Sequence, residues 1–104
     1  MQTPTPQQVV EGLVARFDAQ KAGTLKANVV LELSGEPWTL VIANGTCRAE
    51  AGAVAPNLTL RVSVADFLAL AGGQLDAATA LMTGRLKITG DLGLAQRFQT
   101  LFRA

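Results

Sequence analysis

Few side chains in this chain of 104 residues could carry out catalysis. The sequence has no histidine and no tyrosine, which removes imidazole acid–base chemistry, histidine-based triads and histidine metal sites. The single cysteine, Cys47, has no histidine to activate its thiol, and we expect it to pack as a small apolar residue or to lie near the surface. We therefore expect no enzyme activity, and neither a metal nor any other cofactor.

Helix capping and solvation account for the carboxylates. Asp66, Asp76 and Asp91 each stand at the expected start of a helix, where an aspartate accepts hydrogen bonds from free backbone N–H groups. Glu32 and Glu50 are expected on the wet face of a sheet, whereas paired catalytic carboxylates need a cleft. The sequence therefore predicts no acid–base pair.

Composition indicates one densely packed domain over residues 1–104, in which residues 1–6 form a loose leader. Hydrophobic residues make up 49% of the chain and charged residues 16%, so burial should be extensive. The net charge of +1, without a basic run, gives nucleic acid no electrostatic binding site and attracts an anionic membrane only weakly.

The sequence lacks the signals that direct a chain into a membrane. No apolar run approaches the roughly 20 residues that span a bilayer, and no apolar signal region follows the polar start. One cysteine cannot form an internal disulfide, which suits a reducing compartment. We therefore expect a cytoplasmic protein with no integral membrane segment.

Apolar periodicity predicts the elements that hold these residues. It has helical spacing over residues 6–19 and then changes to alternation. The alternating segments, which we predict to be strands, are residues 25–34, 38–42, 46–51, 58–62 and 85–89. Turn signals at residues 34–37 and at Asn44-Gly45 separate the first three strands. Short turns between successive strands indicate an antiparallel sheet, with one wet face and one face covered by helices.

Two short helices are predicted between the fourth and fifth strands. Ser63 and Asp66 fit a capping box that opens the first helix, and Gly72-Gly73 ends it. Asp76 caps the second helix, and Gly84 closes it in the left-handed conformation. The residues that share the apolar side of this second helix are Leu75, Ala78, Leu81 and Met82.

A last amphipathic helix is predicted over residues 92–102, after Gly90 and the capping residue Asp91. Its apolar stripe consists of Leu94, Ala95, Phe98, Leu101 and Phe102. We expect this helix to cover the hydrophobic interior as a lid. We also expect it to be the most plastic element, because chain ends are the cheapest to displace.

Residues 81–95 closely resemble the C-terminal signature of the sterol carrier protein type 2 family. The shared order is a helix end, a glycine, the alternating strand Arg85-Leu86-Lys87-Ile88, the pair Gly90-Asp91, and the start of a helix rich in leucine and alanine. Upstream segments that match the family in the same order are Trp38-Thr39-Leu40, Asn44-Gly45, Leu58-Thr59-Leu60 and residues 66–70. The resemblance covers roughly residues 9–102.

The resemblance implies an α+β fold: a five-stranded, mainly antiparallel sheet covered on one face by about four helices, with an apolar tunnel between the layers. It also implies a non-catalytic intracellular carrier that takes a sterol, a fatty acid, an acyl-CoA or a phospholipid acyl chain. The chain departs from the family at two points. Asn57 stands where many members have an acidic residue, so we assign no function to this position. The peroxisomal tail of the eukaryotic carriers is missing, so we do not expect their localisation.

Under this resemblance, apolar residues that would otherwise be core become candidates for lipid contact, and we expect about half of them to line a cavity. The candidates are Leu40, Leu60, Leu68, Leu81, Met82, Ile88, Phe98, Leu101 and Phe102. Arg97 and Arg103 are weaker candidates for contact with an anionic head group. The alternative is a protein-interaction or dimerisation module, whose apolar groove would hold a second copy of the chain or a segment of a larger enzyme.

Overall fold

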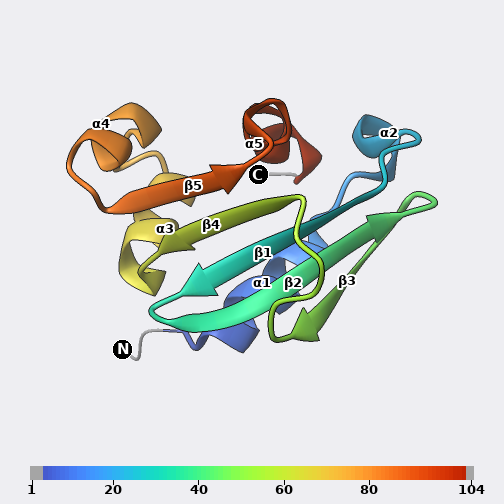
Figure 1. The fold of residues 1–104 in the computed structure, drawn as a ribbon, viewed down its shortest axis with the longest axis horizontal. Coiled ribbons are helices and arrows are strands. Elements are labelled where there is room, and N and C mark those ends of the chain that lie inside the picture. The colour runs from blue at the N-terminus through green and yellow to red at the C-terminus, as the bar shows by residue number, and fades with distance from the viewer. Residues whose placement is uncertain (1–3, 103–104) are drawn as a thin grey trace.

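Five strands form one sheet, and helices pack on one of its faces (Figure 1). The computed structural model describes residues 4–102. The strands are β1 (Ala27–Leu33), β2 (Glu36–Ala43), β3 (Thr46–Ala51), β4 (Leu58–Val62) and β5 (Leu86–Gly90), in the spatial order β3-β2-β1-β4-β5. The predicted α+β architecture with a mainly antiparallel, five-stranded sheet is confirmed.

The helices are short and most begin at a capping side chain. They are α1 (Pro6–Ala15), α2 (Ala19–Ala22), α3 (Val64–Ala71), α4 (Ala77–Met82), α5 (Leu92–Phe98) and the final 3-10 turn η1 (Gln99–Leu101). As predicted, Asp76 Oδ2 accepts a hydrogen bond from the Thr79 N–H at 3.2 Å. Asp91 Oδ1 likewise accepts one from the Leu94 N–H at 3.1 Å. No helix in residues 4–102 has the length and apolar character needed to cross a bilayer.

The first helix differs from its prediction at both ends. Thr5, placed in the predicted leader, caps α1, while the first three residues of that leader lie outside the described residues. At the other end α1 stops at Ala15 instead of continuing to residue 19. Asp18 caps the separate helix α2, because its carboxylate competes for the backbone N–H groups that a continuous helix would use. The break leaves Phe17 free to form an isolated β-bridge with Phe102.

The sheet contains one parallel pair, β1 with β4, which differs from the antiparallel pairing that the short turns indicate. Residues 52–57 cause the difference, since they carry the chain from β3 across the outer face of the sheet to the far side of β1 (Figure 1). Thr39 Oγ1 donates to the Gly52 carbonyl at 2.7 Å and accepts from the Val54 N–H at 3.0 Å. The loop therefore buries Thr39. Its position over the outer face also accounts for the buried Val30, which interrupts the alternation of apolar and polar residues along β1.

The rest of the outer face is the predicted wet and charge-balanced surface. Arg61 Nε lies 3.2 Å from Glu32 Oε2 across the β1–β4 pair. Arg48 Nε lies 3.2 Å from Glu50 Oε1 along β3. Exposed ion pairs of this kind contribute little to stability, and we interpret the outer face of the sheet as a solvated surface.

The most deeply buried part of the core lies on the inner face of β1 and β2. The strand residues there, each no more than 1% exposed, are Val29, Leu31, Leu33, Leu40 and Ile42. Val10 of α1 is fully buried against the same cluster. The inner face of β4 and β5 has different surroundings, because α1 packs mainly on β2 and β3.

Candidate functional site

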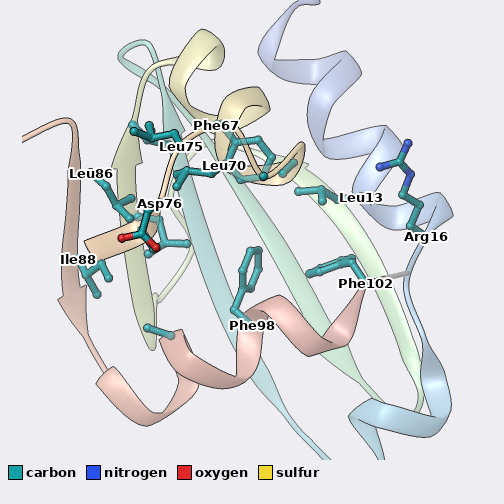
Figure 2. Close-up of a pocket in the computed structure, with 16 residues that line it drawn as sticks. Leu13, Arg16, Phe67, Leu70, Leu75, Asp76, Leu86, Ile88, Phe98 and Phe102 are labelled. Carbon is teal, nitrogen blue, oxygen red and sulfur yellow. The ribbon is translucent and has the colours of Figure 1, made fainter. Parts of the chain in front are cut away.

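A cavity of about 660 Å³ lies between the helices and the β4–β5 part of the sheet (Figure 2). Its floor is formed by two cross-strand pairs, Leu60 with Ile88 and Val62 with Leu86. Its other walls come from α1, α3, the start of α4 and the C-terminal segment. The large apolar side chains on those walls are Leu13, Phe67, Leu70, Leu75, Phe98 and Phe102.

The cavity exists because the helical layer is interrupted over this half of the sheet. The helices α3, α4 and α5 contain 8, 6 and 7 residues. Gly73 and Gly84, with φ of 79° and 77°, end α3 and α4 in a conformation that costs glycine little. Short helices separated by turns cannot form a continuous cover. The strand residues that line the open space between them are Leu60, Val62, Leu86 and Ile88.

Aromatic residues of the C-terminal segment form one wall. The ring centroids of Phe98 and Phe102 lie 5.0 Å apart, and those of Phe17 and Phe102 lie 6.0 Å apart. The segment is held to the start of α2, because the Asp18 N–H donates to the Leu101 carbonyl at 2.7 Å. The predicted helix over residues 92–102 is therefore too long: its last turn is the 3-10 turn η1, and Phe102 is extended in order to reach Phe17.

Sequence comparison assigns the chain that forms this cavity to a family. Residues 10–103 match the model of the SCP-2 sterol transfer family. The chain belongs to this family. It is 34% identical over 83 residues to peroxisomal multifunctional enzyme A of Dictyostelium discoideum, which covers 78% of this chain and 19% of that enzyme. It is 37% identical over 70 residues to sterol carrier protein 2 of Homo sapiens, which covers 62% of this chain and 12% of that protein.

The SCP-2 chain thus spans about a fifth or less of the length of these relatives. Solved structures share its fold. The sec-alkylsulfatase Pisa1 from Pseudomonas sp. matches with a TM-score of 0.87 and 22% identity, over 97% of this chain and 17% of that chain. Palmitated SCP2L2 from Aedes aegypti matches with a TM-score of 0.56 and 20% identity, over 91% of this chain and 95% of that chain. At these identities the likeness concerns the fold alone.

The structure separates the nine candidate lipid-contact residues of this SCP-2 domain into three groups. Those that line the cavity are Leu60, Ile88, Phe98 and Phe102. Those that are fully buried in the core, away from the cavity lining, are Leu40 and Leu101. Those that lie outside the lining on the surface are Leu68, Leu81 and Met82, which are 38%, 45% and 88% exposed.

The exposed positions of Leu81 and Met82 correct the predicted orientation of α4. The prediction counted helical spacing from Leu75, but Leu75 precedes the Asp76 cap and lines the cavity from the turn. The helix itself begins at Ala77, and Ala80 is its fully buried residue. Because about 3.6 residues make one helical turn, Leu81 and Met82 lie on other sides of α4 than Ala80 and point away from the interior.

Two charged side chains line the cavity, and the sequence did not indicate either as part of a site. Arg16 follows Leu13 by three positions, and that spacing places both on one side of α1 (Figure 2). Asp76 was predicted only as a helix cap, a role that it also has. Only the spacing from Leu13 could have indicated from the sequence that Arg16 lines the cavity, since a polar residue on the same side of a helix as an apolar stripe faces the same space.

Arg97 has a structural role instead of the head-group contact considered from the sequence. Its Nη2 donates to the Ala22 carbonyl at 2.8 Å and to the Lys21 carbonyl at 3.1 Å. These bonds tie α5 to the end of α2, outside the cavity lining. Arg103, the other candidate, lies outside the described residues.

Among residues 4–102, the charged side chains of the cavity lining are Arg16 and Asp76. Cys47 packs against the core and is not among the lining residues, as the sequence suggested. Burial raises the pKa of its thiol from 9.0 to about 11, so the thiol is uncharged at neutral pH. Asp76 is the one carboxylate found in the lining, counted over residues 4–102, and its Oδ2 is occupied by the α4 cap.

Proposed function

We propose that this chain is a non-catalytic lipid carrier that takes an apolar chain into the cavity between sheet and helices. The observation that supports this most is the cavity itself, about 660 Å³ of space over an apolar floor. Ligand sites typically have volumes of about 300 to 1,000 Å³ with mostly apolar walls. A fatty acid, an acyl-CoA, a phospholipid acyl chain or a sterol would enter by removal of apolar surface from water.

Burial of an acyl chain supplies the binding energy in this proposal. Each methylene group transferred from water contributes about 0.8 kcal/mol. The floor residues Leu60 and Ile88 and the aromatic wall of Phe98 and Phe102 would make the contacts. The palmitate carried by the related SCP2L2 fold supports an acyl chain as the ligand. We further propose that the domain acts in the cytoplasm, without transforming its ligand and without binding nucleic acid.

Filling the cavity tests the proposal. In Ile88→Trp the larger side chain occupies the floor, so we expect the affinity for dodecanoate, measured by titration calorimetry, to fall at least tenfold. Met82→Trp is the matched control, because Met82 is 88% exposed and outside the lining. Wild-type affinity in the Ile88 variant, with its fold retained by circular dichroism, would contradict the site.

A second candidate function is an accessory module that docks on a larger enzyme or on a second copy. It is favoured by the relatives, in which the matching segment is 12% to 19% of the length, and by the Pisa1 chain, of which it is 17%. Native mass spectrometry separates the two candidates. Lipid that co-purifies with a monomer supports the carrier, whereas a lipid-free, concentration-dependent dimer supports the module.

A further inference from the structure

β3 is the edge strand of the sheet on the side away from the cavity (Figure 1). It pairs with β2, and in residues 4–102 no further strand pairs with its other edge. Its two charged side chains, Arg48 and Glu50, are 70% and 38% exposed, and Arg48 Nε lies 3.2 Å from Glu50 Oε1. An open edge offers unpaired backbone N–H and C=O groups, so another strand can be added there.

The phase of the β2–β3 ladder decides which residues of β3 face the open edge. The tight turn Asn44-Gly45 is closed by Ala43 and Thr46, and the closing residues of a two-residue turn hydrogen-bond each other. Hydrogen-bonded and non-hydrogen-bonded pairs alternate along an antiparallel ladder. The Gly52 N–H, which donates to the Pro37 carbonyl at 2.9 Å, keeps the same phase. The residues whose backbone groups face outward are therefore Cys47, Ala49 and Ala51.

A second copy of β3 can satisfy these groups in one register. An antiparallel pair with its two-fold axis at Ala49 places Ala49 opposite its own copy and Cys47 opposite Ala51. It also places Arg48 opposite Glu50 of the second copy, at a non-hydrogen-bonded position, where facing side chains are closest. Opposite charges at such a position stabilise a strand pair.

The neighbouring registers are disfavoured by the same charges. An axis at residue 48 would place Arg48 opposite its own copy, and an axis at residue 50 would do the same with Glu50. Like charges directly opposite each other destabilise a strand pair. The other edge strand, β5, carries Lys87 and no carboxylate, so it is not complementary to itself. Arg48 and Glu50 thus favour one edge and one register.

We propose that β3 is a homodimerisation edge, on which a second copy of this chain adds its own β3 to form one continuous sheet. The contact is isologous, so both copies contribute the same residues. The cavity floor lies on β4 and β5, at the far end of the strand order, so the dimer leaves both cavities open. The inference is independent of the proposed lipid binding, and it differs from a copy held in the apolar groove.

Edge protection is the competing account of the two charges. Charged side chains on an edge strand keep other strands away, and an exposed ion pair contributes little to stability. Under that account the chain stays monomeric. A pair of six-residue strands is also a small contact beside the roughly 1,200 to 2,000 Å² of standard interfaces, so the proposed dimer is weak and forms at high protein concentration.

Charge reversal with a paired rescue tests the proposal. Sedimentation equilibrium of wild type, with a reductant that keeps Cys47 from forming an intermolecular disulfide, should give a dimer with a Kd on the order of 100 µM. Arg48→Glu makes the edge acidic and Glu50→Arg makes it basic, so each variant alone should dimerise at least tenfold more weakly. An equal mixture of the two should form a heterodimer about as tight as the wild-type dimer. Lys87→Glu, a charge reversal on the other edge, is the matched control and should leave dimerisation unchanged.

A backbone variant tests the same contact without changing charge. Ala49→Pro removes the outward N–H at the two-fold axis, and proline is tolerated in an edge strand where the N–H faces solvent. It should abolish the dimer, whereas Ile88→Trp, which fills the cavity, should not affect it.

The outcomes separate this inference from the proposed function. A wild-type chain that stays monomeric at about 1 mM overturns the dimerisation edge, as does a dimer that survives both Arg48→Glu and Glu50→Arg. A dimer that is lost in Ile88→Trp places the second copy in the apolar groove and also overturns it. Binding of dodecanoate is measured separately, so failure of the dimer leaves the proposed lipid binding intact.

Discussion

The two halves of the sheet carry the same alternating apolar pattern and use it differently. On β2, Leu40 and Ile42 are at most 1% exposed and pack under the ten-residue helix α1. On β4 and β5, Leu60 and Ile88 face a cavity of about 660 Å³. The strands do not decide between core and cavity. The length and continuity of the helices above them do.

The difference has an energetic consequence. A rigid, dry void of 660 Å³ would cost roughly 16 kcal/mol at about 24 cal/mol per Å³. Whole domains are stable by only about 5 to 15 kcal/mol. The cavity half must therefore hold lipid or water, or its walls must move inward. The exposed positions of Arg16 and Asp76 in the lining agree with contact to solvent.

Leucine truncation in each half should give the largest contrast. Leu40→Ala should lower the free energy of unfolding by about 4 kcal/mol, because it removes apolar burial and leaves a new void. Leu60→Ala should cost about 2 kcal/mol, the transfer term alone, since space already exists beside it. Urea unfolding of both variants measures the difference. Equal losses would mean that the cavity half is packed like the core.

Hydrogen exchange should show a smaller contrast between the same halves. Amides of α5, a seven-residue helix beside the cavity, should open with a free energy about 2 kcal/mol lower than those of β1 and β2, which pair on both sides. Dodecanoate should slow exchange in α5 and leave β1 unchanged. Exchange in α5 that is as slow as in β1, and insensitive to dodecanoate, would refute the plastic lid predicted from the sequence.

The sequence predicted the local devices well because each acts within a few residues. Gly84 closes α4 with a φ of 77°, and Asn44-Gly45 forms the tight turn with φ of 53° and 72°. Position 90 requires glycine for a second reason that the sequence does not reveal: a Cβ there would lie 2.5 Å from the Asn57 carbonyl oxygen. Capping and turn formation need no knowledge of the rest of the fold.

What the sequence could not predict depends on contacts between distant segments. The parallel β1–β4 pair follows from a loop that crosses the outer face and buries Thr39. The inward side of α4 depends on the position of the Asp76 cap relative to Leu75. Leu40 and Leu60 have equivalent patterns, so only the placement of α1 separates a core residue from a cavity residue.

Methyl-group NMR during titration with dodecanoate tests the central claim most directly, because it reports on both halves of one molecule in one experiment. The account predicts that the methyl signals of Leu60 and Ile88 shift in a saturable way, while those of Leu31 and Leu40 stay in place. Saturable shifts centred on Leu31 and Leu40, or no saturable shift at Leu60 and Ile88, would contradict it.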